Sequence, residues 1–515
     1  MPRWIRGCPT NRRAGRALPL LLALASLAAR PVATASLAAQ SPKDLARRLD
    51  RRLDAPPFNR QLWGVALVDD RGTLLYGRNH DRLFIPASNT KIVVTTVATA
   101  LLPADYTVRT SVYAAGPVVD GRIEGDLVLY GRGDPTFSKR CYAVDTTAAG
   151  ACDADPRARL RTLVDALRAR GIRSVTGDLV GDGSYFEPTL VNGEWSSYDL
   201  NWWYAAPVSG LGFNDNSIDI TYAPGAAPGA PVTLAFTPDF GDVTLENRTR
   251  TVAGGAESTL DFFREPATLR LYAQGVLPET SHGGLESFAL PDPNLFAAEA
   301  LRSLLGDAGI SVAGTTRSTV DSTRYAAARA APPLAEVTSR PLEDWIFPIL
   351  NTSQNWYAEM LLKQLGKRFG RAGSWPEGLA VERRFLIDSV GVDSTQISLT
   401  DGSGLSSVNL VSPLAFTQLL RFIRRHPHWP VFAAGLPQST KAGSLHDRFR
   451  GTPLEGRVRA KTGSIGRVNA LSGFIELPSG RTLTFSVEAN HHTLPGREMI
   501  AQIDSVVLDM ARGAK

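Results

Sequence analysis

Ser88 and Lys91 stand three residues apart at the start of an apolar segment that contains no helix breaker before Pro103. Pro86 suits a first helical turn, so the segment predicts a buried helix that begins near Ala87. Side chains three residues apart share one helix face, with Cβ atoms about 5–6 Å apart. A serine becomes a good nucleophile when a neighbouring base takes its proton, and a lysine serves as that base when burial lowers its pKa. The pair therefore predicts serine acyl transfer, against the alternative of an N-cap serine beside a solvated lysine.

A second candidate pair, Ser353 and Asn355, precedes a segment whose apolar residues recur at helical spacing. The segment predicts a helix from Asn355 with Gly366 as its C-cap, which places both side chains on the loop that enters the helix. There, Ser353 would relay a proton between Lys91 and a leaving amine. Asn355 would hold the peptide group of a substrate or orient Lys91. The alternative is a Ser/Asn capping pair.

The third candidate group is Lys461, Thr462 and Gly463, which the sequence places at the end of a predicted strand, before a short glycine-containing turn. Two further strands are predicted at residues 470–477 and 482–489, on either side of a Pro-Ser-Gly turn. A lysine and a threonine at such a strand end would bind a carboxylate. The alternative is a basic, solvent-exposed strand end.

Gly463 and the residue after it, Ser464, add a second function to this group. Because glycine has no Cβ, Gly463 lets a ligand approach the backbone closely. The amides of Ser464 and Ser88 would then form an oxyanion hole, where loss of one donor typically costs about 10²–10³ in rate.

Taken together, the motifs S-x-x-K, S-x-N and K-T-G occur in this order and resemble those of the class C low-molecular-mass penicillin-binding proteins. Members of that family are D-alanyl-D-alanine carboxypeptidases and endopeptidases of bacterial peptidoglycan. The long separation of Ser88 from Ser353 matches a family that inserts extra domains between its first two motifs. Two further segments resemble family signatures: residues 401–406 followed by Asn409, and residues 202–207 with 214–216.

The resemblance implies a role for each motif residue. Asp182 resembles the residue of the insertion that family members use against the side chain of a dibasic peptide residue. Many relatives have an arginine where this chain has Ser407, and that arginine helps to bind the free carboxylate of meso-diaminopimelate, so strict specificity for this residue is not implied unless another cation such as Arg467 substitutes. The motif roles implied are nucleophile for Ser88, general base for Lys91, second motif for Ser353 and Asn355, and carboxylate clamp for Lys461 and Thr462.

The predicted function is a serine D,D-peptidase that cleaves D-Ala-D-Ala, or D-Ala-diamino acid cross-links, through an acyl-enzyme on Ser88 and that β-lactams inhibit. A serine β-lactamase is one alternative, but it needs an extra base to deacylate a penicilloyl adduct. The sequence has Ser353 where a tyrosine base would stand, and no Glu-x-x-x-Asn loop follows it. A non-catalytic scaffold that binds peptidoglycan or penicillin is the other alternative. The intact set of motif residues argues against such a retired site.

Residues 1–39 are predicted to be a secretory signal peptide. Several arginines precede an apolar stretch at residues 17–29, which is too short to span a bilayer, and cleavage is expected after Ala35 or Ala39. The mature protein would be periplasmic or otherwise extracytoplasmic, with no transmembrane anchor. In that oxidising compartment the remaining cysteines, Cys141 and Cys152, are expected to form a disulfide that contributes about 3 kcal/mol.

The composition of the chain indicates which classes of binding partner to expect. A net charge of +6 over 515 residues suits work near anionic cell-wall polymer, which would supply peptidoglycan stem peptides as substrates. The seven histidines show no metal-ligand spacing, so no metal is expected. The sequence has no glycine-rich phosphate loop and no interleaving of aromatic and basic residues. We therefore expect no cofactor and no nucleic acid.

The predicted fold class is α+β. Residues 41–104 and 334–515 would form one split domain of the serine transpeptidase/β-lactamase type, an α/β/α sandwich with an antiparallel sheet, because neither piece alone can close a core. Residues 105–333 would form a strand-rich, multi-domain insertion that ends in a return linker at 326–333. The elements expected in the split domain are helices at 41–55 and 497–512 and a hairpin of strands at 63–68 and 73–77. Strands are expected in the insertion at 125–130, 177–181, 217–222, 232–236 and 269–273.

Overall fold

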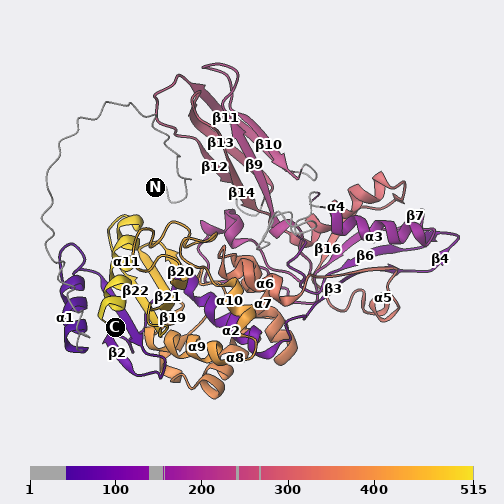
Figure 1. Ribbon diagram of the computed structural model, residues 1–515. Coiled ribbons are helices and arrows are strands. Elements are labelled where there is room, and N and C mark those ends of the chain that lie inside the picture. The colour runs from indigo at the N-terminus through magenta and orange to yellow at the C-terminus, as the bar shows by residue number, and fades with distance from the viewer. Residues whose placement is uncertain (1–41, 138–154, 156, 239–242, 266–267, 514–515) are drawn as a thin grey trace, which may run out of the picture. The chain divides into compact units, whose positions relative to one another are not determined.

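The computed structural model describes residues 42–137, 155, 157–238, 243–265 and 268–513 of the protein (Figure 1). The predicted signal peptide at residues 1–39 and the predicted Cys141–Cys152 disulfide lie outside these residues. In the part of the chain that is described, no helix combines the length and the apolar composition that crossing a membrane requires.

An antiparallel sheet joins the two ends of the described chain. Its strands are β1 (Leu62–Val68), β2 (Leu74–Arg78), β20 (Val458–Ile465), β21 (Val468–Glu476) and β22 (Thr482–Asn490). They lie in the order β2-β1-β22-β21-β20. β1 pairs with β22 along its whole length, with Val65 opposite Val487. The predicted sheet, shared by the N-terminal and C-terminal segments, is therefore confirmed.

One face of this sheet is covered by α11 (Gly496–Gly513), and α1 (Pro42–Leu53) packs against α11. Leu45, Leu49 and Leu53 recur every four residues along α1, so they lie on one face, and all three are buried in one apolar cluster with α11 and the sheet. Burying a leucine side chain contributes about 1.5–3 kcal/mol. Both helices were predicted to within two residues at each end.

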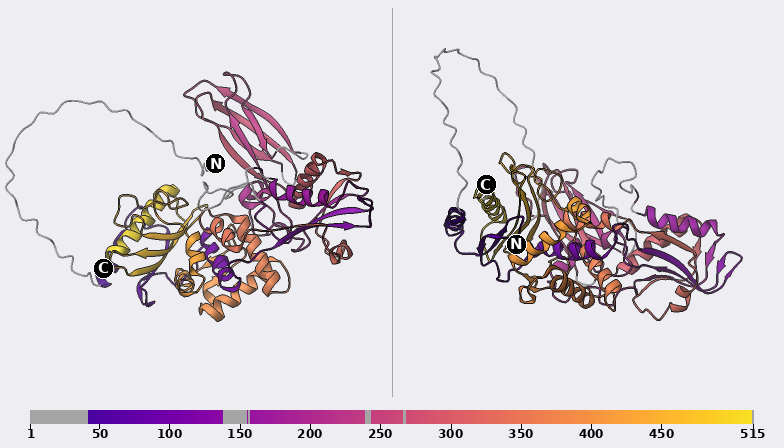
Figure 2. Two further views of the ribbon diagram at one scale, coloured as in Figure 1. Left: turned by 45° about the vertical axis from the view of Figure 1, so that its right-hand side comes forward. Right: turned by 60° about the horizontal axis from the view of Figure 1, so that its bottom comes forward.

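Helices cover the opposite face, with α2 (Lys91–Leu101) at their centre. Residues 91–99 of α2 are all buried, so the helix is enclosed on every side although it contains Lys91 and three threonines. The views in Figure 2 place α11 on one side of the yellow strands and the orange helices on the other. The helices that surround α2 are α6 (Leu342–Leu350), α7 (Asn355–Phe369), α8 (Trp375–Phe385), α9 (Pro413–Arg425) and α10 (Trp429–Gly435).

The residues between α2 and α6 form two groups of strands (Figure 1). The first group comprises β3 (Arg109–Ala115), β4 (Val118–Val119), β5 (Arg122–Ile123), β6 (Asp126–Tyr130), β7 (Ser174–Val175), β8 (Leu179–Asp182), β15 (Ser311–Val312), β16 (Thr316–Thr319) and β17 (Ala335–Thr338). The second comprises β9 (Ser217–Ala223), β10 (Thr233–Thr237), β11 (Thr244–Val252), β12 (Asp261–Arg264), β13 (Arg270–Pro278) and β14 (Gly284–Ala289). In the first group, one sheet has the order β16-β8-β6-β3-β17 and a smaller sheet has the order β15-β7-β5-β4. In the second group, the two sheets have the orders β10-β9-β14 and β11-β13-β12.

The insertion differs from its prediction in its helices, its return linker and its C-terminal boundary, and it contains strands that were not predicted, among them β3, β11 and β14. It contains two helices that were not predicted, α3 (Ala158–Ala169) and α4 (Pro293–Asp307), which contact each other and help to bury the first group of strands. The expected return linker includes a short helix, α5 (Ala326–Ala330). β17 pairs with β3, so the chain leaves the sheet of the insertion after Thr338 and not at residue 334. The boundary was misplaced because a four-residue edge strand carries little periodic signal.

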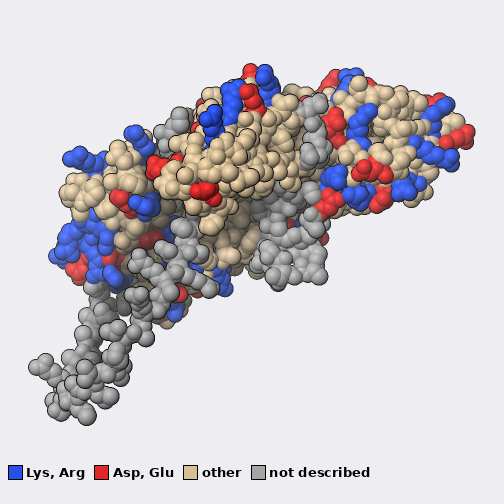
Figure 3. All heavy atoms as spheres, turned by 90° about the horizontal axis from the view of Figure 1, so that it is seen from above, with Lys and Arg blue, Asp and Glu red and all other residues tan. Residues whose placement is uncertain are grey.

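The surface is charged in both signs. On the face shown in Figure 3, lysines and arginines lie beside aspartates and glutamates in most of the charged areas, with a wide uncharged area between them. Charges of both signs are thus mixed on this face.

Candidate active site

Ser88 lies in a tight turn, whereas the sequence predicted that it would lie in the first turn of an α-helix. Residues Ala87–Thr90 form a 3₁₀ turn, η1, that continues directly into α2. Ala87 has φ +47°, a left-handed conformation that costs a residue with a Cβ about 1–2 kcal/mol. Such strain is found where the surrounding structure imposes it, often at functional sites. The turn leaves Ser88 partly exposed while its neighbours Asn89 and Thr90 are buried.

Lys91 is completely buried and its ammonium position has three neighbours. Nζ lies 3.0 Å from Ser88 Oγ, 2.6 Å from Asn355 Oδ1 and 2.7 Å from the Ser403 carbonyl oxygen. Burial lowers the pKa of Lys91 to about 7, although Asp401 and Glu359 act in the opposite direction. A large fraction of Lys91 is therefore neutral near pH 7.

The three contacts suit a neutral amine, which has two N–H donors and one lone pair. Asn355 Oδ1 and the Ser403 carbonyl accept the two hydrogens of Lys91. The lone pair then remains for the hydroxyl of Ser88, which can donate its proton to Nζ. This arrangement is what a general base for Ser88 requires.

Asn355 is the first residue of α7, as predicted, and the insertion holds it in place. Its Nδ2 donates to the carbonyl oxygen of Tyr204 at 2.8 Å, and Gln354 Nε2 donates to Asp215 Oδ2 at 2.9 Å. These partners lie in the segments 202–207 and 214–216, which the sequence singled out without a role. The helix extends to Phe369, so Gly366 lies inside it and is not its C-cap.

A second hydrogen-bonded pair joins Ser353 to Lys461. Lys461 Nζ donates to Ser353 Oγ and to the Thr462 carbonyl, both at 2.9 Å. Ser353 has φ +66°, a second left-handed residue in this region. Burial, and then the neighbouring charge of Lys91, lower the pKa of Lys461 well below its usual value. The influence of Lys91 on Lys461 links the two hydrogen-bonded pairs into one site.

The K-T-G residues lie within β20 and not at its end, because the turn to β21 falls at Gly466. Gly463 approaches the turn that carries Ser88 closely: a Cβ there would lie 2.5 Å from the Pro86 carbonyl oxygen. The close approach predicted for Gly463 is thus made by protein backbone. Thr462 is partly exposed and Ser464 is exposed, so the edge of β20 beside Ser88 is open to a ligand.

The loop at residues 401–409, which follows α8 in the chain, is organised by Asp401. The carboxylate of Asp401 is completely buried. It accepts hydrogen bonds from the amides of Gly404 and Ser406, from Asn409 Nδ2 and from Trp195 Nε1, at 2.7–3.0 Å. These bonds shape the loop that presents the Ser403 carbonyl to the site. The sequence marked this segment as a signature but gave no reason for it.

Comparison with known proteins agrees with this geometry. Residues 45–509 match the model of the D-Ala-D-Ala carboxypeptidase 3 (S13) family. The chain is 31% identical over 527 residues to the D-alanyl-D-alanine carboxypeptidase of Actinomadura sp. (strain R39), which covers 100% of this chain and 93% of that protein. The chain belongs to the S13 family.

Solved structures agree with the fold. The crystal structure of penicillin binding protein 4 from Haemophilus influenzae superposes with a TM-score of 0.75 at 22% identity, over 90% of this chain and 97% of that one. A second structure of the same protein, complexed with a β-lactam, gives 0.70 at 21% identity, over 90% and 98%. The predicted α+β fold and the predicted resemblance to class C penicillin-binding proteins are confirmed, and the S13 family makes this chain a serine-type D-Ala-D-Ala carboxypeptidase.

Asp182 does not have the role that the resemblance implied. Its side chain has no exposed surface, and its carboxylate is paired with Arg329 Nη1 at 2.5 Å. A buried carboxylate that already has a cationic partner cannot bind the side chain of a peptide without breaking that pair. The prediction is corrected: Asp182 is part of the sheet's internal structure.

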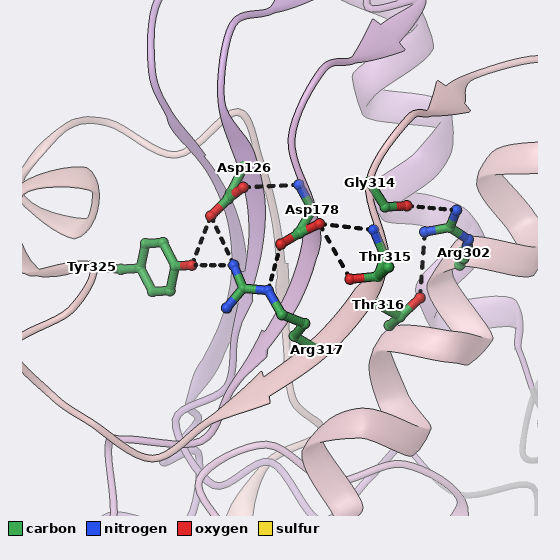
Figure 4. Close-up of polar contacts among 8 residues, drawn as sticks. All are labelled: Asp126, Asp178, Arg302, Gly314, Thr315, Thr316, Arg317 and Tyr325. Atoms are coloured by element: carbon green, nitrogen blue, oxygen red, sulfur yellow. Dashed lines mark hydrogen bonds and ion pairs between the residues drawn. The ribbon is translucent and has the colours of Figure 1, made fainter.

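Other acidic residues of the same sheet have similar roles. Arg317 Nε donates to Asp178 Oδ2 at 2.5 Å, and its Nη2 donates to Asp126 Oδ2 at 3.2 Å. Tyr325 OH also donates to Asp126 Oδ2, at 2.8 Å (Figure 4). These bonds connect β6 and β16 with Asp178, the residue before β8. The acidic residues of this sheet thus neutralise arginines of the insertion.

The two positions tied to peptide specificity are open to solvent. Ser407 is exposed on the 401–409 loop, and Arg467 is exposed in the turn between β20 and β21. Among the residues described, no three His, Cys, Asp or Glu side chains are grouped so that they could hold a metal ion.

Proposed function

We propose that Ser88 is the acylated nucleophile of this D-Ala-D-Ala carboxypeptidase and that Lys91 is its general base. In the first step Ser88 gives its proton to Lys91 Nζ, and its oxygen attacks the carbonyl carbon of the D-Ala-D-Ala bond. The observation that carries this proposal is the buried amine of Lys91, whose two hydrogens have acceptors and whose lone pair is left for Ser88.

The negative oxygen of the tetrahedral intermediate would accept hydrogen bonds from the amides of Ser88 and Ser464. Gly463 supports this assignment, because it brings β20 against the turn that carries Ser88. Thr462, on the open part of β20, and the buried Lys461 beside it would hold the terminal carboxylate of the substrate.

Collapse of the intermediate breaks the carbon–nitrogen bond, and the departing amine must gain a proton. Ser353 would relay this proton from Lys91, with Lys461 bonded to its Oγ at 2.9 Å. Terminal D-Ala leaves, and an ester between the substrate and Ser88 remains. Water then attacks the ester and regenerates the serine. A D-Ala-diamino acid cross-link differs only in the departing amine, so the same steps would give endopeptidase activity.

The β-lactamase alternative needs a base that activates water against the penicilloyl ester. Asp401 and Glu359, the carboxylates that influence Lys91, both accept hydrogen bonds from backbone amides and tryptophan side chains. They are therefore occupied, and Ser353 lacks the phenol that would otherwise serve. We propose slow deacylation, with β-lactams acting as inhibitors.

Intact-protein mass after incubation with a penicillin tests the proposal, with Ser88→Ala as control. A stable gain of one drug mass that is absent in Ser88→Ala is expected. No adduct with intact drug would favour a non-catalytic scaffold, and no adduct with hydrolysed drug would favour a β-lactamase. Release of D-Ala from diaminopimelate-type and lysine-type stem peptides then measures specificity. With Ser407 in place of an arginine, we expect less preference for diaminopimelate than in relatives that have the arginine.

We also propose that residues 1–39 direct export, so that the mature enzyme acts on peptidoglycan in an extracytoplasmic compartment. The arginine-rich start, the short apolar stretch and the small residues before Ala35 and Ala39 support this proposal. In that compartment Cys141 and Cys152 would be paired. The mass of the exported protein, before and after reduction and alkylation, gives both the cleavage site and the state of the cysteines. Retention of residues 1–39, or alkylation without reduction, would contradict these proposals.

A further inference from the structure

A buried glutamate on α7 contacts the loop that binds Lys91. Glu359 lies four residues after Asn355, so the two side chains share a face of the helix. Glu359 is completely buried. Its Oε1 accepts a hydrogen bond from the Ser403 amide at 2.7 Å, and its Oε2 accepts from the Gly402 amide at 3.1 Å and from Trp375 Nε1 at 2.8 Å.

Ser403 contacts both Glu359 and Lys91: its amide donates to Glu359, and its carbonyl oxygen accepts from Lys91. The Ser403 carbonyl oxygen lies 2.7 Å from Lys91 Nζ. On the other side, Gly404 has φ +79°, and a Cβ there would overlap the carbonyl oxygen of Ala87. The backbone of residues 402–404 is thus confined between Glu359 and the nucleophile turn, and a shift of this backbone would move the acceptor that orients Lys91.

The chemistry of this position requires a carboxylate. Three N–H donors from two segments converge on its two oxygens. A glutamine has one acceptor oxygen, so its NH₂ group would face at least one of these donors. A charged-group hydrogen bond contributes about 1.5–3 kcal/mol, which is enough to hold a short loop against thermal motion.

We propose that Glu359 is a positioning residue for acyl transfer: its carboxylate fixes the turn at residues 402–404, so that the Ser403 carbonyl holds Lys91 Nζ towards Ser88 Oγ. This inference rests on the proposed function, because it assigns a role within the same site.

Several charged groups face Glu359. Asp401 comes from the loop itself, Glu382 from α8 and Lys91 from α2. Lys363, one turn further along α7, lies over the Trp375 ring at 3.5 Å and pairs with Glu187 of the insertion at 3.2 Å. Burial and the charge of Asp401 raise the pKa of Glu359 to about 7, against the three N–H donors that lower it.

The charge on Glu359 also raises the pKa of Lys91. Removing that charge should therefore let Lys91 lose its proton at lower pH. Glu359→Gln is expected to have two effects on acylation: a lower rate, because the turn is no longer fixed, and an acid limb that moves to lower pH. A purely structural role for Glu359 would change the amount of folded protein without moving the acid limb.

Glu382 provides a matched control. It is completely buried near the same acidic groups, but neither of its carboxyl oxygens has a hydrogen-bond partner among the described residues. Burial, and then Glu359 and Asp401, raise the pKa of Glu382 well above its usual value. Glu382→Gln thus leaves the hydrogen bonds that hold residues 402–404 unchanged.

The experiment measures the rate of penicillin acylation of the full mature protein by intact mass from pH 5 to 9. We expect Glu359→Gln to be about 10- to 100-fold slower at pH 8, since misplacement by 1 Å can cost about 10²-fold. Its acid limb should lie below that of the wild type, and Glu382→Gln should match the wild type. A Glu359→Gln protein with the rate and profile of the wild type, or equal losses in both variants, would overturn the inference.

Two further measurements distinguish the loss of positioning from misfolding and from failure of the proposed function. If Glu359→Gln does not fold, Glu359→Asp is measured in its place. Aspartate keeps the carboxylate but has a shorter side chain. Glu359→Asp should therefore fold, and its rate of acylation should be lower than that of the wild type. An unchanged rate in Glu359→Asp would overturn the positioning role. A wild-type protein that forms no adduct would overturn the proposed function itself, which the variants alone do not do.

Discussion

The contact between Gly404 and the turn that carries Ser88 predicts the effect of adding a side chain at residue 404. Gly404 has φ +79°, and an added Cβ would overlap the carbonyl oxygen of Ala87 and lie 2.8 Å from Thr90 Oγ1. Gly404→Ala therefore has two costs. The left-handed backbone costs about 1–2 kcal/mol for a residue with a Cβ, and forcing an atom into a packed site costs typically about 1–3 kcal/mol. We expect a total loss of about 2–5 kcal/mol in the free energy of unfolding.

Gly391 separates these two costs. It has φ +80°, almost the same as Gly404, but a Cβ there would have no neighbour within 4 Å. Gly391→Ala should thus lose only the backbone part, about 1–2 kcal/mol. The difference between the two variants measures the clash with the turn that carries Ser88.

The assay is thermal unfolding of both variants together with their rate of penicillin acylation. In a cooperative unit of about 150–250 residues, 1 kcal/mol shifts the midpoint by about 2–4 °C. Gly391→Ala should acylate at the wild-type rate, and Gly404→Ala should acylate much more slowly because the Ser403 carbonyl and the Ser88 turn are pushed apart. Equal midpoints and equal acylation rates in the two variants would refute the proposed contact.

Three other predictions follow from the site and the insertion. Acylation should fall as pH decreases through about 7, because Lys91 must be neutral to accept the Ser88 proton, and its pKa is lowered to about 7; a limb near the ordinary lysine value of about 10.4 would contradict this. Asn355→Ala removes an acceptor 2.6 Å from Lys91 Nζ, so kcat for D-Ala release should fall about 10²-fold; an unchanged kcat would exclude this orienting role. Asp182→Ala leaves Arg329 without its partner and should cost about 3–5 kcal/mol of stability while peptide preference stays the same; a raised KM for dibasic peptides at unchanged stability would restore the substrate-binding role.

The sequence predicted that the motif residues meet, and it predicted the sheet, because each depends on short-range patterns. An S-x-x-K pair on a buried helical segment can be recognised from spacing and hydropathy alone, and Ser88 and Lys91 do meet, at 3.0 Å. Alternating strands near the C-terminus likewise predict antiparallel neighbours, and β20 to β22 pair as expected. The local pattern did not predict the backbone geometry: Ser88 lies in a 3₁₀ turn whose first residue, Ala87, has φ +47°.

The residues that orient Lys91 could not be recognised in the same way, since their roles arise only when distant segments meet. Glu359 has the sequence context of an ordinary helix residue, and the amides that donate to it lie 43 and 44 residues further along the chain. Tyr204 acts through a backbone carbonyl, so its side chain carries no signal of the contact with Asn355. Asp182 is the reverse case, an acidic residue in a segment that resembles a binding motif but is neutralised by Arg329, 147 residues away. A motif predicts which chemistry a site performs, whereas the pKa of its base and the direction of its lone pair depend on buried contacts that only the folded chain defines.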